Sequence, residues 1–167
     1  PGIEGFPIVG AAYIFRREGA AWVQEAALMP STADGHNGWI SVAIEGDVVV
    51  VGVWQDSTAE DRAGAAFVYR RSGNSWPLES TLTAADAEFD DAFGFSVAVS
   101  GNMIVVGARA TDSDQAFKGG SVYVFRYNQP NWGQEANFTA KDVGPNDYFG
   151  YSVAAAGDRI AVGRTDF

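Results

Sequence analysis

A short apolar sequence occurs three times in this chain, as Gly10-Ala-Ala-Tyr-Ile-Phe15, Gly64-Ala-Ala-Phe-Val-Tyr69 and Gly120-Ser-Val-Tyr-Val-Phe125. The copies lie 54 and 56 residues apart, counted from residue 13 to 67 and from 67 to 123. A tryptophan recurs in the same register, as Trp22, Trp76 and Trp132. A fixed period of roughly 50 residues indicates a repeat architecture and is typical of propeller blades.

Each repeat is expected to form four short strands. Over one full period they are Phe95–Ser100, Met103–Ala108, Ser121–Arg126 and Glu135–Ala140. The turn Ser100-Gly101-Asn102 joins the first two strands, and Gly and Asn favour such a tight hairpin because both tolerate positive φ. The second strand is continuously apolar, as in Val48–Val51 and Ile104–Val106. This predicts a strand that is covered on both faces.

The fourth strand is more polar and suits an outer edge. The Ala-rich stretch Ala20–Leu28 resembles a helix, but its copies contain Pro77 and Pro130 and indicate a strand. The sequence therefore predicts an all-β fold with two whole blades, Ile40–Ala84 and Phe95–Ala140. Half a blade is expected at each end, with the third and fourth strands at the N-terminus and the first and second strands at the C-terminus.

Joining the two halves would give three blades, fewer than the four to eight that close typical propellers. We expect residues 1–167 to form a single propeller-type repeat domain, with units of about 10–63, 64–119 and 120–167. Each half exposes an apolar strand edge, which is a template for another chain. The domain is therefore expected to belong to a longer chain or a larger assembly. Two copies would form a six-bladed ring, and a contact that does not close would form a filament.

Composition excludes several classes of function. The net charge is −10 and the isoelectric point is about 4.3, which disfavours binding to nucleic acid and to anionic membranes. No stretch approaches the ~18 apolar residues of a membrane span. The absence of cysteine from the sequence excludes thiol catalysis, disulfides and zinc–thiolate sites.

Two further motifs recur with the repeat. The first is Phe93-Gly94-Phe95-Ser96, with a copy at Phe149-Gly150-Tyr151-Ser152, and the second is Val105-Val106-Gly107-Ala108, with a shorter copy at Val162-Gly163. The first repeat departs from both, with Gly38-Trp39-Ile40-Ser41 and Gly52-Val53-Trp54. The motifs resemble FG-GAP repeats, the units of the integrin α-subunit propeller and of many extracellular proteins. The resemblance implies a β-propeller that is secreted or exposed on the cell surface.

Integrin-type repeats often carry a calcium loop between the strands that hold these two motifs. Here that connection is only Glu45-Gly46-Asp47, Ser100-Gly101-Asn102 or Ala156-Gly157-Asp158. A turn this short cannot supply the six to eight oxygen ligands of calcium, so we expect no metal and no cofactor there. The acidic loop Asp86–Asp91 leaves two alternatives open, a cation site or a solvated polar turn.

Few residues are candidates for a site. The single histidine, His36, has no counterpart in the other repeats, and no catalytic set of residues recurs, so we expect no enzymatic activity. Trp39 and Trp54 stand where the first repeat breaks the pattern, and they either bind a ligand such as a sugar ring or replace missing core residues. Asn137 begins an N-glycosylation sequon on the polar fourth strand.

Two functional hypotheses follow. The first is a non-enzymatic extracellular module for adhesion, structural assembly or protein–protein interaction, whose partner is another protein and specifically a copy of itself joined through the half-blade edges. The second is a carbohydrate-binding lectin with glycan sites between the blades.

Overall fold

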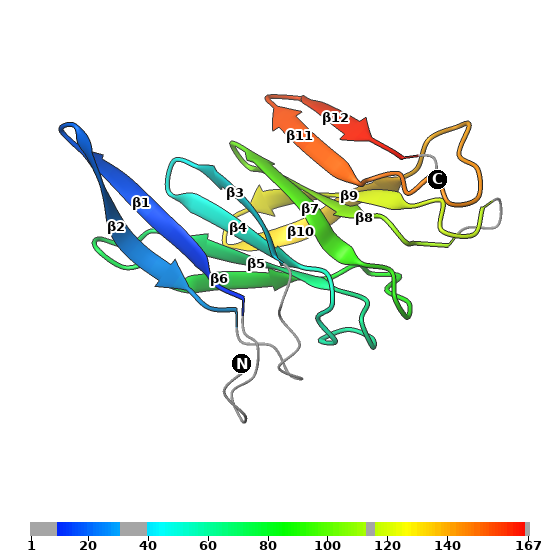
Figure 1. The fold of residues 1–167 in the computed structure, drawn as a ribbon, viewed down its shortest axis with the longest axis horizontal. Coiled ribbons are helices and arrows are strands. Elements are labelled where there is room, and N and C mark those ends of the chain that lie inside the picture. Colours follow the sequence, from blue (N-terminus) through cyan, green and yellow to red (C-terminus); the bar gives the residue numbers. More distant parts are fainter. Residues whose placement is uncertain (1–9, 31–39, 113–115, 166–167) are drawn as a thin grey trace, which may run out of the picture.

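The computed structural model describes residues 10–30, 40–112 and 116–165. These residues form β-strands, turns and loops, and none of them lies in a helix (Figure 1). Within this part of the chain there is accordingly no helix long and apolar enough to cross a membrane. The prediction of an all-β fold, including a strand rather than a helix at residues 20–28, is confirmed.

Four antiparallel sheets follow one another along the chain (Figure 1). The N-terminal half-blade is β1–β2, blade A is β3–β6, blade B is β7–β10, and the C-terminal half-blade is β11–β12. In chain order the strands are β1 (Ala12–Glu18), β2 (Ala21–Leu28), β3 (Ile40–Glu45), β4 (Val48–Val53), β5 (Ala65–Arg70), β6 (Leu78–Leu82), β7 (Phe93–Ser100), β8 (Met103–Ala108), β9 (Ser121–Asn128), β10 (Asn131–Phe138), β11 (Ser152–Ala156) and β12 (Arg159–Gly163). The predicted pattern of half, whole, whole and half is confirmed.

Blades A and B lie between the two half-blades, and an apolar layer fills each of the three interfaces between neighbouring sheets. Alternate residues of β4 belong to two of these layers. Val48 and Val50 face blade B, whereas Val49 and Val51 face the N-terminal half-blade. Val50, Val51, Ile104, Val105 and Val106 are completely buried, as the sequence predicts. A continuously apolar strand is stable in this position because neither of its faces meets water.

Close approaches between glycines set how the blades stack. A Cβ atom added to Gly52 would lie 2.1 Å from the Gly94 carbonyl oxygen, and one added to Gly107 would lie 2.1 Å from the Gly150 carbonyl oxygen. The Ser41 and Ser96 hydroxyls donate to the same two carbonyl oxygens, each at 2.8 Å. The glycine of the Val-Gly motif in one blade therefore lies directly against the glycine carbonyl of the Phe-Gly motif in the next blade.

The blades are joined most closely at their first strands. β3 packs against β7, and β7 packs against β11, whereas the outer strands β6 and β10 make few contacts with each other. Blades that touch along one edge and separate at the other fan out around a common axis, as in a propeller. The structure is thus an arc of a β-propeller.

The outer strand of blade B begins earlier than the sequence suggests. We predict Glu135–Ala140, but β10 starts at Asn131, where it pairs with Asn128 of β9. The sequence does not reveal this earlier start, because residues 131–134 lack alternating apolar residues. Main-chain pairing and one buried tryptophan hold the strand, rather than an alternating buried face.

Candidate functional site

A cross-blade hydrogen bond recurs between outer strands. The Trp76 indole donates to Glu25 Oε1 at 3.0 Å, and the Trp132 indole donates to Glu79 Oε2 at 2.9 Å. Arg70 also donates to Glu79, with its NH2 group 3.1 Å from Oε2. Burial raises the pKa of Glu79, but the hydrogen bonds from Arg70 and Trp132 outweigh it and hold that pKa below its usual value. Each unit thus joins a tryptophan to an Arg–Glu pair of the preceding blade.

At each end of the arc, this set of a tryptophan, an arginine and a glutamate is incomplete. Trp22 is 68% exposed, whereas its equivalent Trp132 is 9% exposed. At the other end, Glu135 pairs with Arg126 at 2.7 Å, and among the described residues no indole approaches it. Because every repeat must bury the same positions, the recurrence of this tryptophan in the sequence predicts that it packs between blades in each copy. That prediction is wrong for Trp22, because the described part of the chain contains no blade in front of it.

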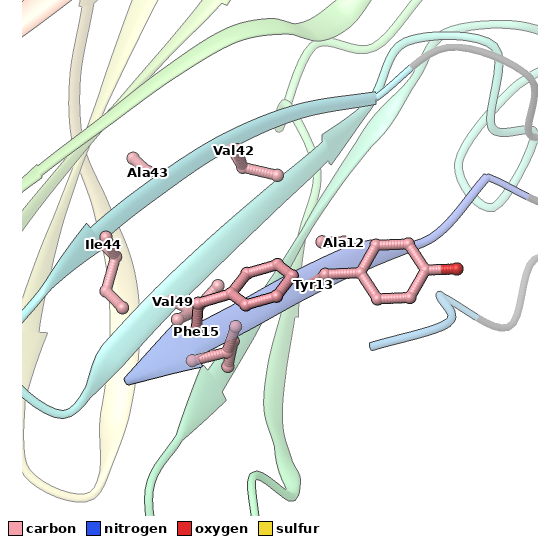
Figure 2. Close-up of a pocket in the computed structure, with 8 residues that line it drawn as sticks. Ala12, Tyr13, Phe15, Val42, Ala43, Ile44 and Val49 are labelled. Atoms are coloured by element: carbon pink, nitrogen blue, oxygen red, sulfur yellow. The ribbon is translucent and has the colours of Figure 1, made fainter. Parts of the chain in front are cut away.

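Apolar side chains are uncovered on the face of the N-terminal half-blade and blade A. Tyr13, Phe15, Val42 and Ile44 are each more than half exposed, and we call these four residues the open apolar face. They line a hollow of about 220 Å³ together with Ala12, Ile14, Ala43 and Val49. Figure 2 shows Val42 and Ile44 extending from β3 toward β1, where the rings of Tyr13 and Phe15 lie.

Equivalent positions inside the arc show what this face lacks. Phe67, Tyr69, Tyr123 and Phe125 occupy the places of Tyr13 and Phe15 in the whole blades, and all four are buried against the preceding blade. Val97 occupies the place of Val42 and is buried in the same way. The open apolar face is therefore an ordinary inter-blade surface that no described residues cover, and exposed patches of this kind mark interaction sites.

The acidic loop lines a second hollow, of about 240 Å³. Asp91 is buried there, and its Oδ2 atom accepts a hydrogen bond from the Glu88 backbone N–H at 2.8 Å. Asp147 does the same for the Gly144 N–H at 2.7 Å in the next repeat. These two carboxylates stabilise a repeated turn, and the described residues contain no group of three or more His, Cys, Asp or Glu side chains arranged to hold a metal.

Asp91 gives this loop a distinctive pH response. Burial raises the pKa of Asp91 to about 6, and the negative charges of Glu88, Asp86 and Asp112 act in the same direction. Because the folded-state pKa is above the unfolded value, the carboxyl contributes stability that is complete below about pH 4 and is lost as the pH rises through about 6.

We therefore expect Asp91→Asn to become more stable relative to the unsubstituted chain as the pH rises from 4 to 7, by up to about 3 kcal/mol. The amide retains an acceptor for the Glu88 N–H, so the turn is preserved. Denaturant titration of both chains at several pH values measures the difference. Asp158→Asn is the matched control, since Asp158 is exposed on a hairpin turn. A constant difference between Asp91→Asn and the unsubstituted chain across this range would contradict the assignment.

Metal removal is expected to leave the melting temperature almost unchanged, because the short hairpin turns offer no calcium loop. Differential scanning calorimetry with free chelator, and with the same chelator already saturated by calcium, measures this. A bound cation stabilises the fold in proportion to the logarithm of its concentration over Kd. A fall of several degrees with free chelator alone would refute the prediction and direct attention to Asp86, Glu88 and Asp90.

Trp54 is half-buried and belongs to a cluster of aromatic rings around one guanidinium group. Its ring centroid lies 6.2 Å from that of Phe95, and Arg109 Cζ lies 5.8 Å from the Trp54 centroid and 4.3 Å from the Phe95 centroid. Arg109 Cζ also lies 5.4 Å from the Tyr148 ring centroid, and the Tyr151 ring packs against Phe95 at a tilt of 52°, with the two centroids 4.9 Å apart. Trp54 therefore packs against blade B, as a core substitute would, while part of its surface meets solvent.

The remaining candidates from the sequence do not come together. Trp39 and His36 lie outside the described residues. Asn137 is exposed on β10, and its amide donates to Asp86 Oδ2 at 2.9 Å. Its glycosylation stays a prediction. Sequence reasoning missed the Arg–Glu pairs, although Arg16 and Glu25, Arg70 and Glu79, and Arg126 and Glu135 each stand nine residues apart and could have been recognised by that spacing.

A family model described as FG-GAP repeat matches residues 22–69, 76–125 and 132–165. Each match begins at the recurring tryptophan and continues into the following blade, and the cross-blade Trp–Glu hydrogen bonds join each match to the one before it. No curated protein matched the chain. Such repeats are typical of β-propeller modules that bind other proteins, and of extracellular or cell-surface proteins. Because the three matches cover most of the sequence, the chain belongs to the FG-GAP repeat family.

Proposed function

We propose that this chain is a non-enzymatic module of an extracellular or cell-surface β-propeller that acts in adhesion or structural assembly by binding protein. The open apolar face carries this proposal. It presents two aromatic rings and two branched aliphatic side chains around a hollow, and aromatic residues are enriched at protein interfaces. The acidic net charge favours a protein partner over nucleic acid.

The acidic side chains support a role without catalysis. Asp91 and Asp147 accept hydrogen bonds from turn amides, and Asp90 pairs with Arg62 and Lys118. Carboxylates that are used in this way are parts of the scaffold rather than free acids and bases.

The experiment immobilises the purified chain and measures which proteins it retains from an extracellular protein extract that also contains a tagged copy of the same chain. Tyr13→Ser with Val42→Ser should abolish retention, because both changes remove exposed apolar area without opening the core. Phe89→Ser is the control, since Phe89 is exposed in the acidic loop, away from this face. Retention of no protein at all, or retention that the double variant leaves unchanged, would contradict the proposal.

The lectin alternative rests on the cluster around Trp54. Aromatic faces stack on sugar rings, and Tyr151 and Trp54 both keep exposed surface beside Arg109. A glycan array with the purified chain tests this alternative. Binding that free sugar competes away and that Trp54→Ala removes would favour the lectin over the protein-binding module.

A further inference from the structure

We propose that Trp54, Phe95, Arg109 and Tyr148 form a binding site for a sugar that carries a carboxylate group, and we call these four residues the arginine cluster. This inference rests on the lectin alternative of the proposed function, because it names the class of sugar that the cluster binds. The arginine cluster lies inside the arc, where blade A meets blade B and the loop that leads to β11.

The order of the strands brings these residues together. Trp54 directly follows β4 and Arg109 directly follows β8, so both stand at the same end of the second strand of a blade. The antiparallel pairing of β7 with β8 places Phe93 beside Ala108. Phe95 therefore lies close to Arg109 within blade B, and their separation of 4.3 Å from ring centroid to Cζ agrees with this arrangement.

Arg109 lacks the acidic partner that comparable side chains have. In the described part of the chain, four basic residues are partly buried. Three of them form ion pairs, namely Arg70 with Glu79, Lys118 with Asp90, and Arg126 with Glu135. For Arg109 the described residues provide no such carboxylate, and its Nε atom is buried without a hydrogen-bond partner. Buried donors are normally paired, so this one indicates an acceptor from outside the chain.

The acidic residues of the two neighbouring turns are engaged elsewhere. The turn of Asp91 lies beside the arginine cluster, because the Asp91 carbonyl oxygen accepts from the Ala110 N–H at 3.1 Å. The Asp91 and Asp147 carboxylates each accept a backbone N–H of their own turn, and Asp147 also pairs with Arg164 at 2.7 Å. Neither turn neutralises Arg109, whose charge remains available to an anion.

The aromatic rings around Arg109 favour a carboxylate as that anion. A guanidinium group that packs on aromatic faces keeps its N–H groups in its own plane, where their fork matches the two oxygens of a carboxylate. Three rings lie within 5.8 Å of Arg109 Cζ, measured to their centroids. They lower the local polarity, and an ion pair is stronger in such surroundings than in open water.

Other features favour a sugar over an acidic protein segment. Trp54 keeps part of its ring exposed beside the guanidinium group, and an aromatic face can stack on a sugar ring. An acidic sugar brings a single negative charge, whereas an acidic protein segment brings several, which the net charge of −10 repels. Trp54 and Arg109 occupy equivalent positions in successive repeats yet differ in chemistry, so packing of the repeat does not require either of them.

Nuclear magnetic resonance titration of the unsubstituted chain tests the site with three probes, methyl glucuronide, methyl galacturonide and methyl sialoside. Each acid is compared with its own methyl ester, which keeps the sugar ring and removes the charge. We expect at least one acid to shift the Nε–H signal of Arg109 and to bind at least about tenfold more tightly than its ester, because only the acid forms a charge-assisted pair.

Substitutions of Arg109 supply the second measurement. Arg109→Gln should weaken binding of that acid about 10- to 100-fold, the loss expected for a hydrogen bond to a charged group. Arg109→Lys retains the charge without the fork, and its affinity should lie between the two. Arg159→Gln is the matched control and should bind like the unsubstituted chain, since Arg159 is exposed on a hairpin turn. Circular dichroism checks that each variant folds, and the comparison of acid with ester needs no variant.

Equal binding of every acid and its ester would overturn the inference, and would leave the lectin alternative standing if Trp54→Ala abolished both. No binding of any of these sugars, with no glycan bound on the array, would contradict the inference and the lectin alternative together. Tighter binding of an Asp-rich peptide than of any acid at Arg109 would also overturn it, in favour of an acidic protein partner. Retention of protein by the open apolar face is a separate measurement, so the proposed protein-binding function stands or falls independently.

Discussion

Replacing Gly107 with alanine is expected to destabilise the fold by about 3 kcal/mol, at the upper end for overpacking. The new Cβ atom would lie 2.1 Å from the Gly150 carbonyl oxygen and 2.4 Å from Ser96 Oγ. Neither can move freely, because Gly150 belongs to the next blade and the Ser96 hydroxyl donates to that same carbonyl. The substitution must therefore separate blade B from the C-terminal half-blade.

Chemical denaturation measures this loss, and Gly133→Ala is its matched control. Gly133 lies on β10, has an ordinary φ, and has no atom within 4 Å of an added Cβ. We expect that variant to stay within about 0.5 kcal/mol of the unsubstituted chain. Equal effects of the two substitutions would show that the glycine contact does not set the spacing of the blades.

Truncating Phe93 to alanine is expected to cost about 3–5 kcal/mol, the range for a fully buried aromatic residue. The ring is completely buried between blades A and B, and its centroid lies 5.3 Å from that of Tyr123 and 6.0 Å from that of Phe125. Both neighbours meet it edge to face, so the loss includes the aromatic contacts as well as the buried area.

Thermal unfolding followed by near-ultraviolet circular dichroism reports this change, because it detects ordered aromatic rings. Phe89→Ala is the comparison, since Phe89 is exposed and its ring contacts only the Arg62 guanidinium among the described cations, at 5.3 Å. Removing that contact should cost less than about 1 kcal/mol. If Phe93→Ala proved as mild as Phe89→Ala, the layer between blades A and B would be packed differently from the structure described above.

The repeat predicts the arrangement of strands because each blade must bury the same residues. The hairpin glycines Gly46, Gly101 and Gly157 all adopt positive φ between first and second strands, as their sequence context indicates. The completely apolar second strand is buried on both faces for the same reason. The hairpin glycines are a local signal and the apolar second strand is a repeated pattern, and both can be recognised in a single sequence.

Burial at the ends of the arc could not be predicted in this way. Trp22 carries the same local sequence signal as Trp132, and its exposure depends on whether a blade precedes it in space. The open apolar face has the same origin, since Tyr13 and Phe15 look like core residues in the sequence. Periodicity predicts the sheet face on which a residue lies, whereas the burial of that residue depends on a neighbouring blade that is remote in sequence.

The acidic loop was ambiguous for a different reason. Composition alone leaves Asp86–Asp91 as either a cation site or a polar turn, because both use clustered carboxylates. The turn is visible only when Asp91 and Asp147 are compared in three dimensions, where each accepts a hydrogen bond from the amide three residues before it.

Amide hydrogen exchange tests the central claim most directly, namely that two whole blades are stacked between two half-blades. The amides of β4 and β8 should exchange most slowly, because both strands pair on two sides and lie under apolar layers on both faces. The outer strands β6 and β10 should exchange faster, since each pairs on one side only. Equal exchange of β4, β8 and the outer strands would contradict the stacked blades on which the whole account depends.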